Sequence, residues 1–230
     1  MNFIGELVDQ WRQHYPELLR GYWTTILLTV LSFAIAMLIG GVAALLRTSE
    51  SRPLRTVSGA YVEFFRNTPL LMQLVFFFFA LPKLHLPVIG RPDWFLLSPF
   101  QAGLIGLSLY TGAYTAEALR SGLLAIDTGQ TEAARSLGLT YLQTRVYVIT
   151  PQALRVSVPL LTSILSALFR NSALVSVIGV TELLQTADNI QQNNFRTFEL
   201  FTLAGILYLS LTLPLAYASS RLERRVAAAR

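Results

Sequence analysis

The sequence contains no cysteine and only two histidines among its 230 residues. Without cysteine, the chain has no disulfide framework, no thiolate metal site and no cysteine nucleophile. The histidines, His14 and His85, lie far apart, and there is neither a His-Glu-x-x-His zinc motif nor a Gly-x-Ser-x-Gly nucleophile elbow. We therefore expect no catalytic residue and no metal ligand, which argues against an enzyme.

Charged residues are also scarce, at 13%, whereas 53% of the residues are hydrophobic. This composition is too apolar for an ordinary soluble domain. The net charge of +5 does not indicate a nucleic-acid partner, because the arginines sit singly or in small groups at the ends of apolar runs. The sequence therefore predicts one integral membrane domain over residues 1–230, with the lipid bilayer as its surroundings.

Apolar runs predict an all-α fold of about five transmembrane helices, because lipid tolerates only helices or closed barrels and these runs are too long for barrel strands. Four of the spans are expected at about residues 22–46, 57–82, 100–119 and 198–219, and another begins near Val156. Pro69 should kink or interrupt the second span. Residues 1–20 have helical amphipathic spacing, and we expect them to lie in the membrane interface.

Clustered arginines predict the topology, because cytoplasmic loops carry an excess of positive charge. The first span is followed by Arg47, Arg52 and Arg55, and residues 120–155 carry four more arginines. Arg221, Arg224 and Arg225 follow the last span. We therefore expect the N-terminus outside and the C-terminus in the cytoplasm.

The hydrophilic connection at residues 124–151 predicts two short cytoplasmic helices. Asp127 can cap the first, with Gln130 three residues on, and Gly138 can end it. Thr140 and Gln143 repeat the capping-box spacing for the second helix.

Small side chains make the first of these helices a candidate partner surface. Ala133, Ala134 and Gly138 would let another protein approach the backbone closely, and Glu132 and Arg135 could pair with its rim. An interfacial linker helix that has small residues by chance explains the same pattern equally well.

The residues Glu132-Ala133-Ala134, then Gly138, then Pro151 resemble the "EAA" loop of ATP-binding-cassette importer permeases. Val148 and Thr150 depart mildly from that pattern and leave its spacing intact. Segments 65–73, 114–117, 170–175 and 196–199 are similar to the polar amino acid branch of this family, and the resemblance covers about residues 20–225.

This resemblance implies a type I importer with a two-permease core, as a homodimer or a heterodimer, in the bacterial inner membrane. It implies that Glu132, Ala133, Ala134, Arg135, Gly138 and Pro151 couple the chain to an ATPase dimer, and that an external binding protein delivers a polar amino acid. The chain lacks the phosphate-binding Gly-x-x-x-x-Gly-Lys-Ser/Thr loop. ATP and magnesium therefore belong to the partner ATPase, and we expect no cofactor on this chain.

Arg170 is the leading candidate for substrate contact, because an arginine within a membrane span should face a protein interior or a wet cavity. We expect Arg170, Asn171 and Ser172 to contact a substrate carboxylate. The alternative is that Arg170 snorkels to head groups or pairs with Glu117 or Glu182.

Other polar groups at membrane depth are further candidates. Pro69 frees backbone groups beside Asn67 and Thr68, although a kink packed against a neighbouring helix is an equal alternative. One face of the third predicted span is polar, and it meets either the substrate or a partner subunit. The candidate pathway residues are Asn67, Thr68, Tyr110, Tyr114, Glu117, Arg170, Asn171 and Ser172.

The pair Arg170-Asn171 bears on the substrate, because the resemblance implies that the family often has Lys-Asp there. A net positive pair favours acidic or uncharged amino acids such as glutamate, aspartate or glutamine. A self-contained secondary transporter or channel is the alternative function. The loop at residues 124–151, called the docking loop below, argues against it.

Overall fold

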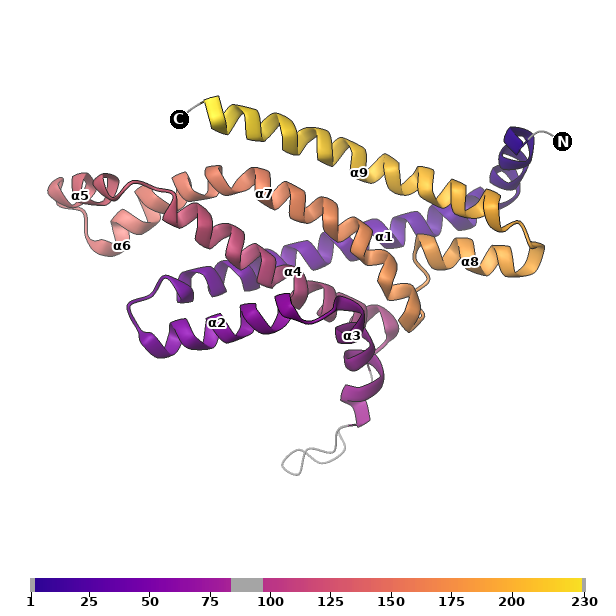
Figure 1. Cartoon of the computed structure of the whole chain (residues 1–230), viewed down its shortest axis with the longest axis horizontal. Helices are drawn as coiled ribbons and strands as arrows, with labels where there is room; N and C mark the ends of the chain where they lie inside the picture. Colours follow the sequence, from indigo (N-terminus) through magenta and orange to yellow (C-terminus); the bar gives the residue numbers. More distant parts are fainter. Residues whose placement is uncertain (1–2, 84–96, 229–230) are drawn as a thin grey trace.

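The computed structural model describes residues 3–83 and 97–228, and the regular structure in these ranges is helical. Four long helices run roughly along the length of the molecule (Figure 1). They are α1 (Phe3–Arg47), α4 (Pro99–Leu124), α7 (Thr150–Asn171) and α9 (Thr197–Ala228). The shorter helices are α2 (Arg52–Asn67), α3 (Leu70–Val75), α5 (Thr128–Ser136), α6 (Tyr141–Gln143) and α8 (Leu183–Asn194). Residues 84–96, which connect the second and third predicted spans and include His85, lie outside the described residues.

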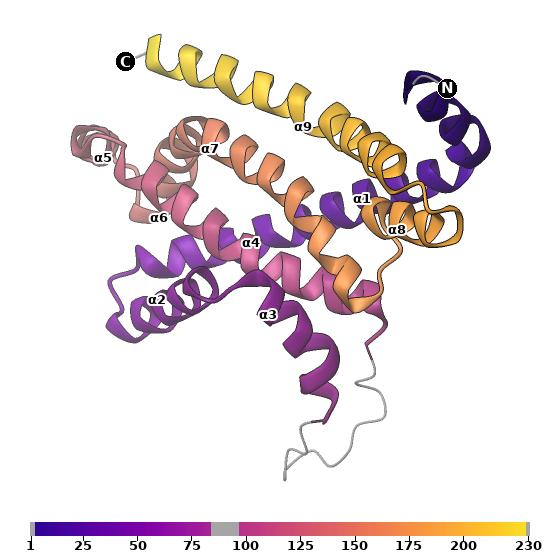
Figure 2. The same ribbon diagram turned by 45° about the vertical axis from the view of Figure 1, so that its right-hand side comes forward.

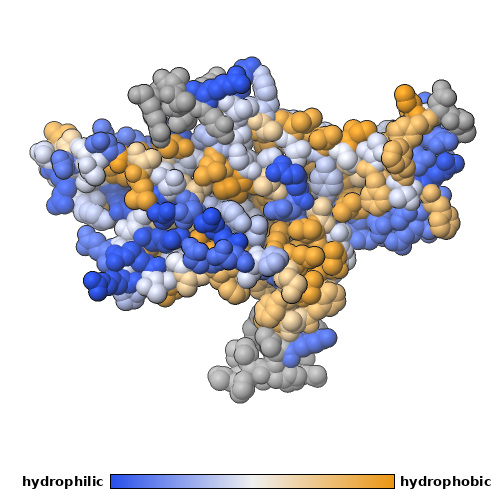
Figure 3. All heavy atoms as spheres, viewed as in Figure 1, coloured by the Kyte–Doolittle hydropathy of each residue, from blue (hydrophilic) through white to orange (hydrophobic). Residues whose placement is uncertain are grey.

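The two ends of the molecule carry different elements. Helices α5 and α6 lie at one end, and α8 lies with the start of α1 at the other (Figures 1 and 2). The first and last helices point their termini toward opposite ends. Blue, hydrophilic side chains gather on the parts that carry α2 and α8, and orange, hydrophobic side chains lie between them (Figure 3).

Helix α4 forms the centre of the bundle and packs most extensively against α1. Their backbones approach closely: a Cβ on Gly40 would stand 2.7 Å from the side chain of Thr115 and 2.8 Å from the carbonyl oxygen of Gly112. Small residues at a crossing let membrane helices pack in this way. Half of the residues of α4 are buried by other helices.

The described residues contain three helices that are long and apolar enough to cross a membrane, or four if the bent pair α2 and α3 counts as one span. The sequence predicted five. The difference is α4, which at about 39 Å is long enough to cross. Its neighbours cover much of its surface, so it carries small and polar residues in place of lipid-facing apolar ones.

The predicted interruption at Pro69 is confirmed. The chain bends by 104° between the segments Arg52–Asn67 and Leu70–Lys83. The side-chain amide of Gln73 donates to the carbonyl oxygens of Phe65 (3.1 Å) and Thr68 (3.2 Å) and to the Thr68 hydroxyl (2.7 Å). Gln73 therefore satisfies carbonyl groups that the broken helix leaves without a backbone partner.

Within the predicted interfacial segment, residues 3–20 belong to the same helix as the first span. Helix α1 runs through Pro16 without interruption into the first span. Its first turns lie at an angle to the rest (Figure 2), as expected where a proline removes a backbone hydrogen bond. Their location in the membrane interface stays a prediction.

Helix α8 was not predicted, and a buried carboxylate fixes its start. Glu182 is fully buried, and its side chain accepts from the Gln185 backbone N–H at 2.9 Å. Thr25 of α1 donates to the same carboxylate at 3.3 Å, and Tyr208 of α9 also donates to it. Burial raises the pKa of the Glu182 carboxyl above its ordinary value, and these hydrogen bonds oppose the shift. Glu182 thus joins α1, α8 and α9.

Candidate functional site

The loop at residues 124–151 folds as two short helices, as predicted. Asp127 caps α5 by accepting the Gly129 N–H at 2.7 Å, and Gly138 follows α5 with a φ of +83°, a conformation that glycine adopts without strain. The Thr140–Gln143 capping box is present. Gln130 does not complete a box with Asp127; its side chain instead accepts from Gln152 at 3.4 Å.

The residues expected to form a partner surface divide between two faces of α5. Glu132, Ala133 and Arg135 are exposed, as are Gly138 after α5 and Pro151 at the start of α7. Ala134 is buried, with 4% of its surface exposed. Of the two alanines, only Ala133 is therefore exposed on this chain, and the coupling role of both stays a prediction.

Large apolar side chains extend this exposed surface. Leu137 is 84% exposed, Tyr147 71% and Leu142 69%. Exposed apolar side chains gathered beside unpaired charges are typical of a surface that another protein or a membrane covers.

Three of the predicted pathway residues line one cavity of about 140 Å³ between α4 and α7. Tyr110 and Tyr114 contribute two hydroxyl groups, joined by a hydrogen bond of 3.2 Å, and Asn171 contributes an amide. Among the described residues the lining is Tyr110, Thr111, Tyr114, Ile164, Ala167, Leu168 and Asn171, and it contains no carboxylate.

Arg66 stands beside the cavity and was not predicted. Its guanidinium lies over the Tyr114 ring, 5.4 Å from the ring centre, which is a cation–π geometry. It belongs to the last turn of α2, before the break at Pro69. The motif at residues 65–73 contained Arg66, but only the fold shows that it meets Tyr114. Thr111 was also missed, because its side chain is indistinguishable in sequence from those that pack between helices.

The segment 170–172 does not act as a cluster. Arg170 is exposed and donates to the Ser166 hydroxyl at 3.2 Å. The Ser172 side chain is fully buried and donates to the Phe169 carbonyl oxygen at 2.8 Å. Only Asn171 lines the cavity. Neither Glu117 nor Glu182 forms an ion pair with Arg170, so the predicted pairing is wrong. Snorkelling of Arg170 to head groups, the other part of that alternative, stays a prediction.

Glu117 belongs to an ion-pair cluster away from the cavity. Its carboxylate accepts from Arg47 of α1 at 2.8 Å and from Arg120, one turn further along α4. The cluster joins the ends of α1 and α4 that lead into the loops. Both oxygens of the Glu117 carboxylate are bound by arginines of this chain. This geometry favours a structural role for Glu117 over direct substrate contact.

Asn67 and Thr68 serve the helix break. Asn67 is exposed and donates to Glu63 at 3.0 Å, and the Thr68 hydroxyl donates to the Phe64 carbonyl oxygen at 2.8 Å. Neither residue lines the cavity between α4 and α7. The kink alternative therefore describes their observed contacts.

The sequence of residues 36–228 matches the family model described as "Binding-protein-dependent transport system inner membrane component". The chain belongs to this family. A glutamate transport system permease protein from Corynebacterium glutamicum is 38% identical over 222 residues, covering 94% of this chain and 97% of the relative. A probable glutamine ABC transporter permease protein from Bacillus subtilis is 35% identical over 206 residues, covering 90% and 91%.

A solved structure agrees with these relatives. The crystal structure of an amino acid ABC transporter with histidines matches with a TM-score of 0.82 at 34% identity, covering 98% of this chain and 99% of that one. The chain is thus an ABC transporter permease with several membrane helices, and the resemblance drawn from its Glu-Ala-Ala loop is confirmed. As an inner membrane component, it is the part of such a system that crosses the bilayer.

Proposed function

We propose that this permease carries a polar amino acid, acidic or uncharged, across the bacterial inner membrane. The observation that supports this most is the cavity between α4 and α7, which offers the hydroxyls of Tyr110 and Tyr114 and the amide of Asn171. These groups hydrogen-bond both polar side chains and carboxylates. The relatives named for glutamate and glutamine transport also support this class.

The charge around the cavity favours this substrate class over cationic amino acids. Arg66 lies over the Tyr114 ring. Glu117, one turn beyond Tyr114, is already paired with Arg47 and Arg120. The described lining contains no carboxylate that would attract a cationic side chain. Positive potential near a site of low dielectric raises the affinity for an anion and lowers it for a cation.

The proposed energy source is an ATPase dimer that holds ATP and magnesium and docks on the exposed face of α5. Glu132, Ala133 and Arg135 are free to meet it, because neither charged side chain has an ion-pair partner within the described residues. A second permease and an external binding protein complete the proposed system. The arginine pattern supports a cytoplasmic loop and an external N-terminus.

The connections of α5 supply a direct mechanical route to the cavity. Residues 125–127 alone join α4 to α5, and α6 continues through Thr144–Ile149 into α7 without a break. The helices that line the cavity are therefore the two that enter the docking loop. Movement of α5 with its ATPase would change the relation of α4 to α7, which is how alternating access could reach Tyr114 and Asn171.

Substitution of Asn171 tests the substrate class. In proteoliposomes that contain the assembled complex, Asn171→Asp adds a carboxylate to the cavity, and we expect competition by glutamate to weaken about tenfold while competition by arginine or lysine strengthens. Uptake of labelled glutamate, glutamine and arginine, with and without ATP, is the measurement. The control is Asn193→Asp, because Asn193 is an exposed residue of α8 and the substitution makes the same chemical change away from the cavity.

Two results would contradict this proposal. Preference of the unsubstituted complex for arginine or lysine would reject the substrate class. Uptake by the permease alone, without an ATPase and without ATP, would instead support a self-contained secondary transporter or channel.

A further inference from the structure

A basic cleft opens behind α5, at the ends of α1 and α4. It has a volume of about 390 Å³, and four arginines from four different segments line it. The basic cleft is lined by Arg47, Thr48, Arg120, Leu123, Leu124, Ile126, Thr128, Thr131, Arg135, Tyr141, Thr144, Arg145 and Ile149. Arginine is therefore the charged side chain of the cleft, and the lining formed by the described residues contains no carboxylate.

The arginines of the basic cleft outnumber the carboxylates that could neutralise them. Arg47 and Arg120 share Glu117, so these three side chains together carry one positive charge. Arg135 and Arg145 have no carboxylate partner in the part of the chain that the structure describes. Several positive charges around a partly enclosed space attract an anion.

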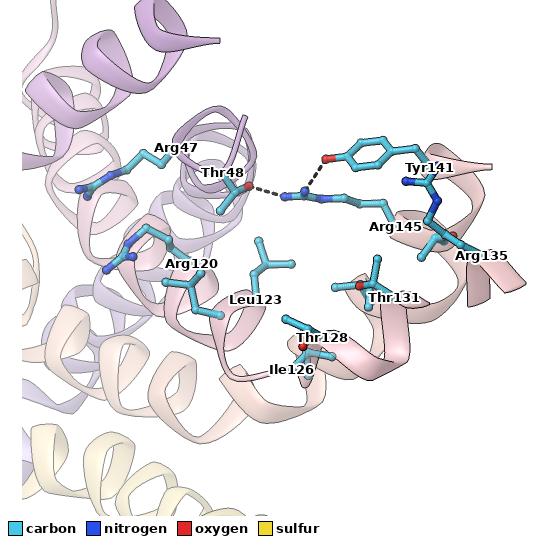
Figure 4. A pocket seen from close by; sticks show the side chains of 13 residues that line it. Arg47, Thr48, Arg120, Leu123, Ile126, Thr128, Thr131, Arg135, Tyr141 and Arg145 are labelled. Atoms are coloured by element: carbon cyan, nitrogen blue, oxygen red, sulfur yellow. Dashed lines mark hydrogen bonds between the residues drawn. The ribbon is translucent and has the colours of Figure 1, made fainter. Parts of the chain in front are cut away.

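Arg145 is held across the opening by neutral groups. Its guanidinium donates to the Tyr141 hydroxyl at 2.8 Å and to the Thr48 hydroxyl (Figure 4). A guanidinium has five N–H donors, so several are left for a ligand. Thr144, which also lines the cleft, is 2% exposed, and its hydroxyl lacks a hydrogen-bond partner in the described structure.

The basic cleft continues into an apolar groove along the membrane-crossing helices. The groove has a volume of about 120 Å³ and shares Leu123 with the cleft. A more open cavity of about 620 Å³ shares Arg145 with the cleft and Leu45 with the groove. Its lining includes one carboxylate, that of Glu50, which forms no ion pair with Arg145 in the described residues. The groove lies between α1, α4 and α7 and is lined by Gly41, Ala44, Leu45, Leu119, Leu123, Thr150, Ala153 and Leu154.

We propose that this cleft and groove bind one anionic phospholipid, with its phosphodiester at Arg145 and Arg135 and the start of an acyl chain along Leu123 and Leu45. Arginine suits this ligand because its planar fork matches phosphate oxygens. A basic pocket between helices at a membrane surface, joined to an apolar groove, matches the two halves of a phospholipid. This lipid site goes beyond the transport function proposed above and requires only that the α5 end lies at a membrane surface.

The geometry of α5 leaves both a lipid and a docked protein room to bind. Thr128, Thr131 and Arg135 follow one another at helical spacing and face the cleft. Glu132 and Ala133 lie on the exposed side. A bound phospholipid would therefore support α5 from behind and fix its position relative to α1 and α4. Of the residues proposed to meet the ATPase it would engage Arg135 alone, and it would leave Glu132 and Ala133 uncovered.

Native mass spectrometry of the purified complex with its ATPase tests the site, with phosphatidylglycerol and phosphatidylcholine as the added lipids. We expect phosphatidylglycerol to be retained by the permease and phosphatidylcholine to be lost. Arg145→Gln should weaken retention of phosphatidylglycerol about tenfold, because it removes a charge-assisted contact with phosphate. Arg145→Lys, which keeps the charge, should retain more lipid than Arg145→Gln and shows whether the loss follows charge.

Arg52→Gln is the matched control, because Arg52 is exposed at the same end of the molecule and lines none of the three cavities. Its lipid retention should equal that of the unsubstituted complex. Equal retention in Arg145→Gln and Arg52→Gln would overturn the proposal. Displacement of the lipid by inorganic phosphate alone would assign the cleft to a soluble anion, and loss of the lipid whenever the ATPase is bound would assign it to that partner; either result would also overturn the lipid site.

Discussion

Glu182 shows how much a single buried side chain contributes to this bundle. Its carboxylate is shared by Thr25, Tyr208 and the backbone of Gln185, so three helices depend on one residue. The sequence offered Glu182 only as a possible partner of Arg170. Two of its partners, Thr25 and Tyr208, lie 157 and 26 positions away along the chain, and no local pattern reveals them.

Replacement of Glu182 should therefore affect stability in a way that depends on the substituent. We expect Glu182→Ala to lower the free energy of unfolding by about 1–3 kcal/mol, because buried hydrogen-bonding groups lose their acceptor. Glu182→Gln keeps one carbonyl oxygen and should cost less. Thermal unfolding of the detergent-solubilised complex measures both, with Glu63→Gln on exposed α2 as the control.

The pH dependence of these variants has a defined sign. Because burial raises the pKa of Glu182, its contribution to stability is complete below the ordinary carboxyl pKa and is lost as the pH rises through the raised value. Glu182→Gln does not titrate. The wild-type chain should therefore lose stability relative to Glu182→Gln as the pH rises from about 4, and a constant difference would contradict the buried-carboxyl account.

Reasoning from local sequence also predicted only some of the residues that line the candidate cavity. Tyr110 and Tyr114 were predicted together, because residues four apart share a helix face. Residues 170–172 were also grouped, but successive side chains on a helix point about 100° apart. The end of α7 accordingly directs Asn171 to the cavity and buries Ser172 elsewhere.

Among the elements, the long helices were predictable and α8 was not. Arginines bound the apolar runs of α1 and α9, so the positions of these runs follow from composition and charge. The short α8 is rich in Asn and Gln and has no apolar run to mark it. Its position depends on Glu182 and on packing of Leu183 and Ala187 against α1 and α9, which are tertiary contacts.

Substitution of Gly138 in the turn after α5 tests whether the backbone conformation of the docking loop matters for stability and for ATPase binding. Gly138 has a φ of +83° and open space at its missing Cβ, so Gly138→Ala meets backbone strain alone. We expect a loss of about 1 kcal/mol in stability and weaker copurification with an ATPase. Gly205→Ala in α9 also meets open space, but without the positive φ. It should not reduce either quantity, and equal effects of the two substitutions would show that the turn geometry is unimportant.

At the scale of the whole molecule, the docking loop and the cavity are two ends of one mechanical unit. Both α4 and α7 begin or end in the loop, and both line the cavity. The Glu117 cluster fixes α4 to α1 next to the loop. In the proposed function, movement of α5 would therefore be converted into movement around Tyr114 and Asn171.

ATP-dependent uptake by the reconstituted complex, compared between the unsubstituted chain and Glu132→Lys, tests this account most directly. We expect the unsubstituted permease to copurify with an ATPase and to accumulate glutamate or glutamine only when ATP is supplied. Glu132→Lys should lose both the ATPase and the uptake, because it reverses the charge on the exposed docking face. Uptake by the permease without an ATPase, or full coupling in Glu132→Lys, would contradict the account.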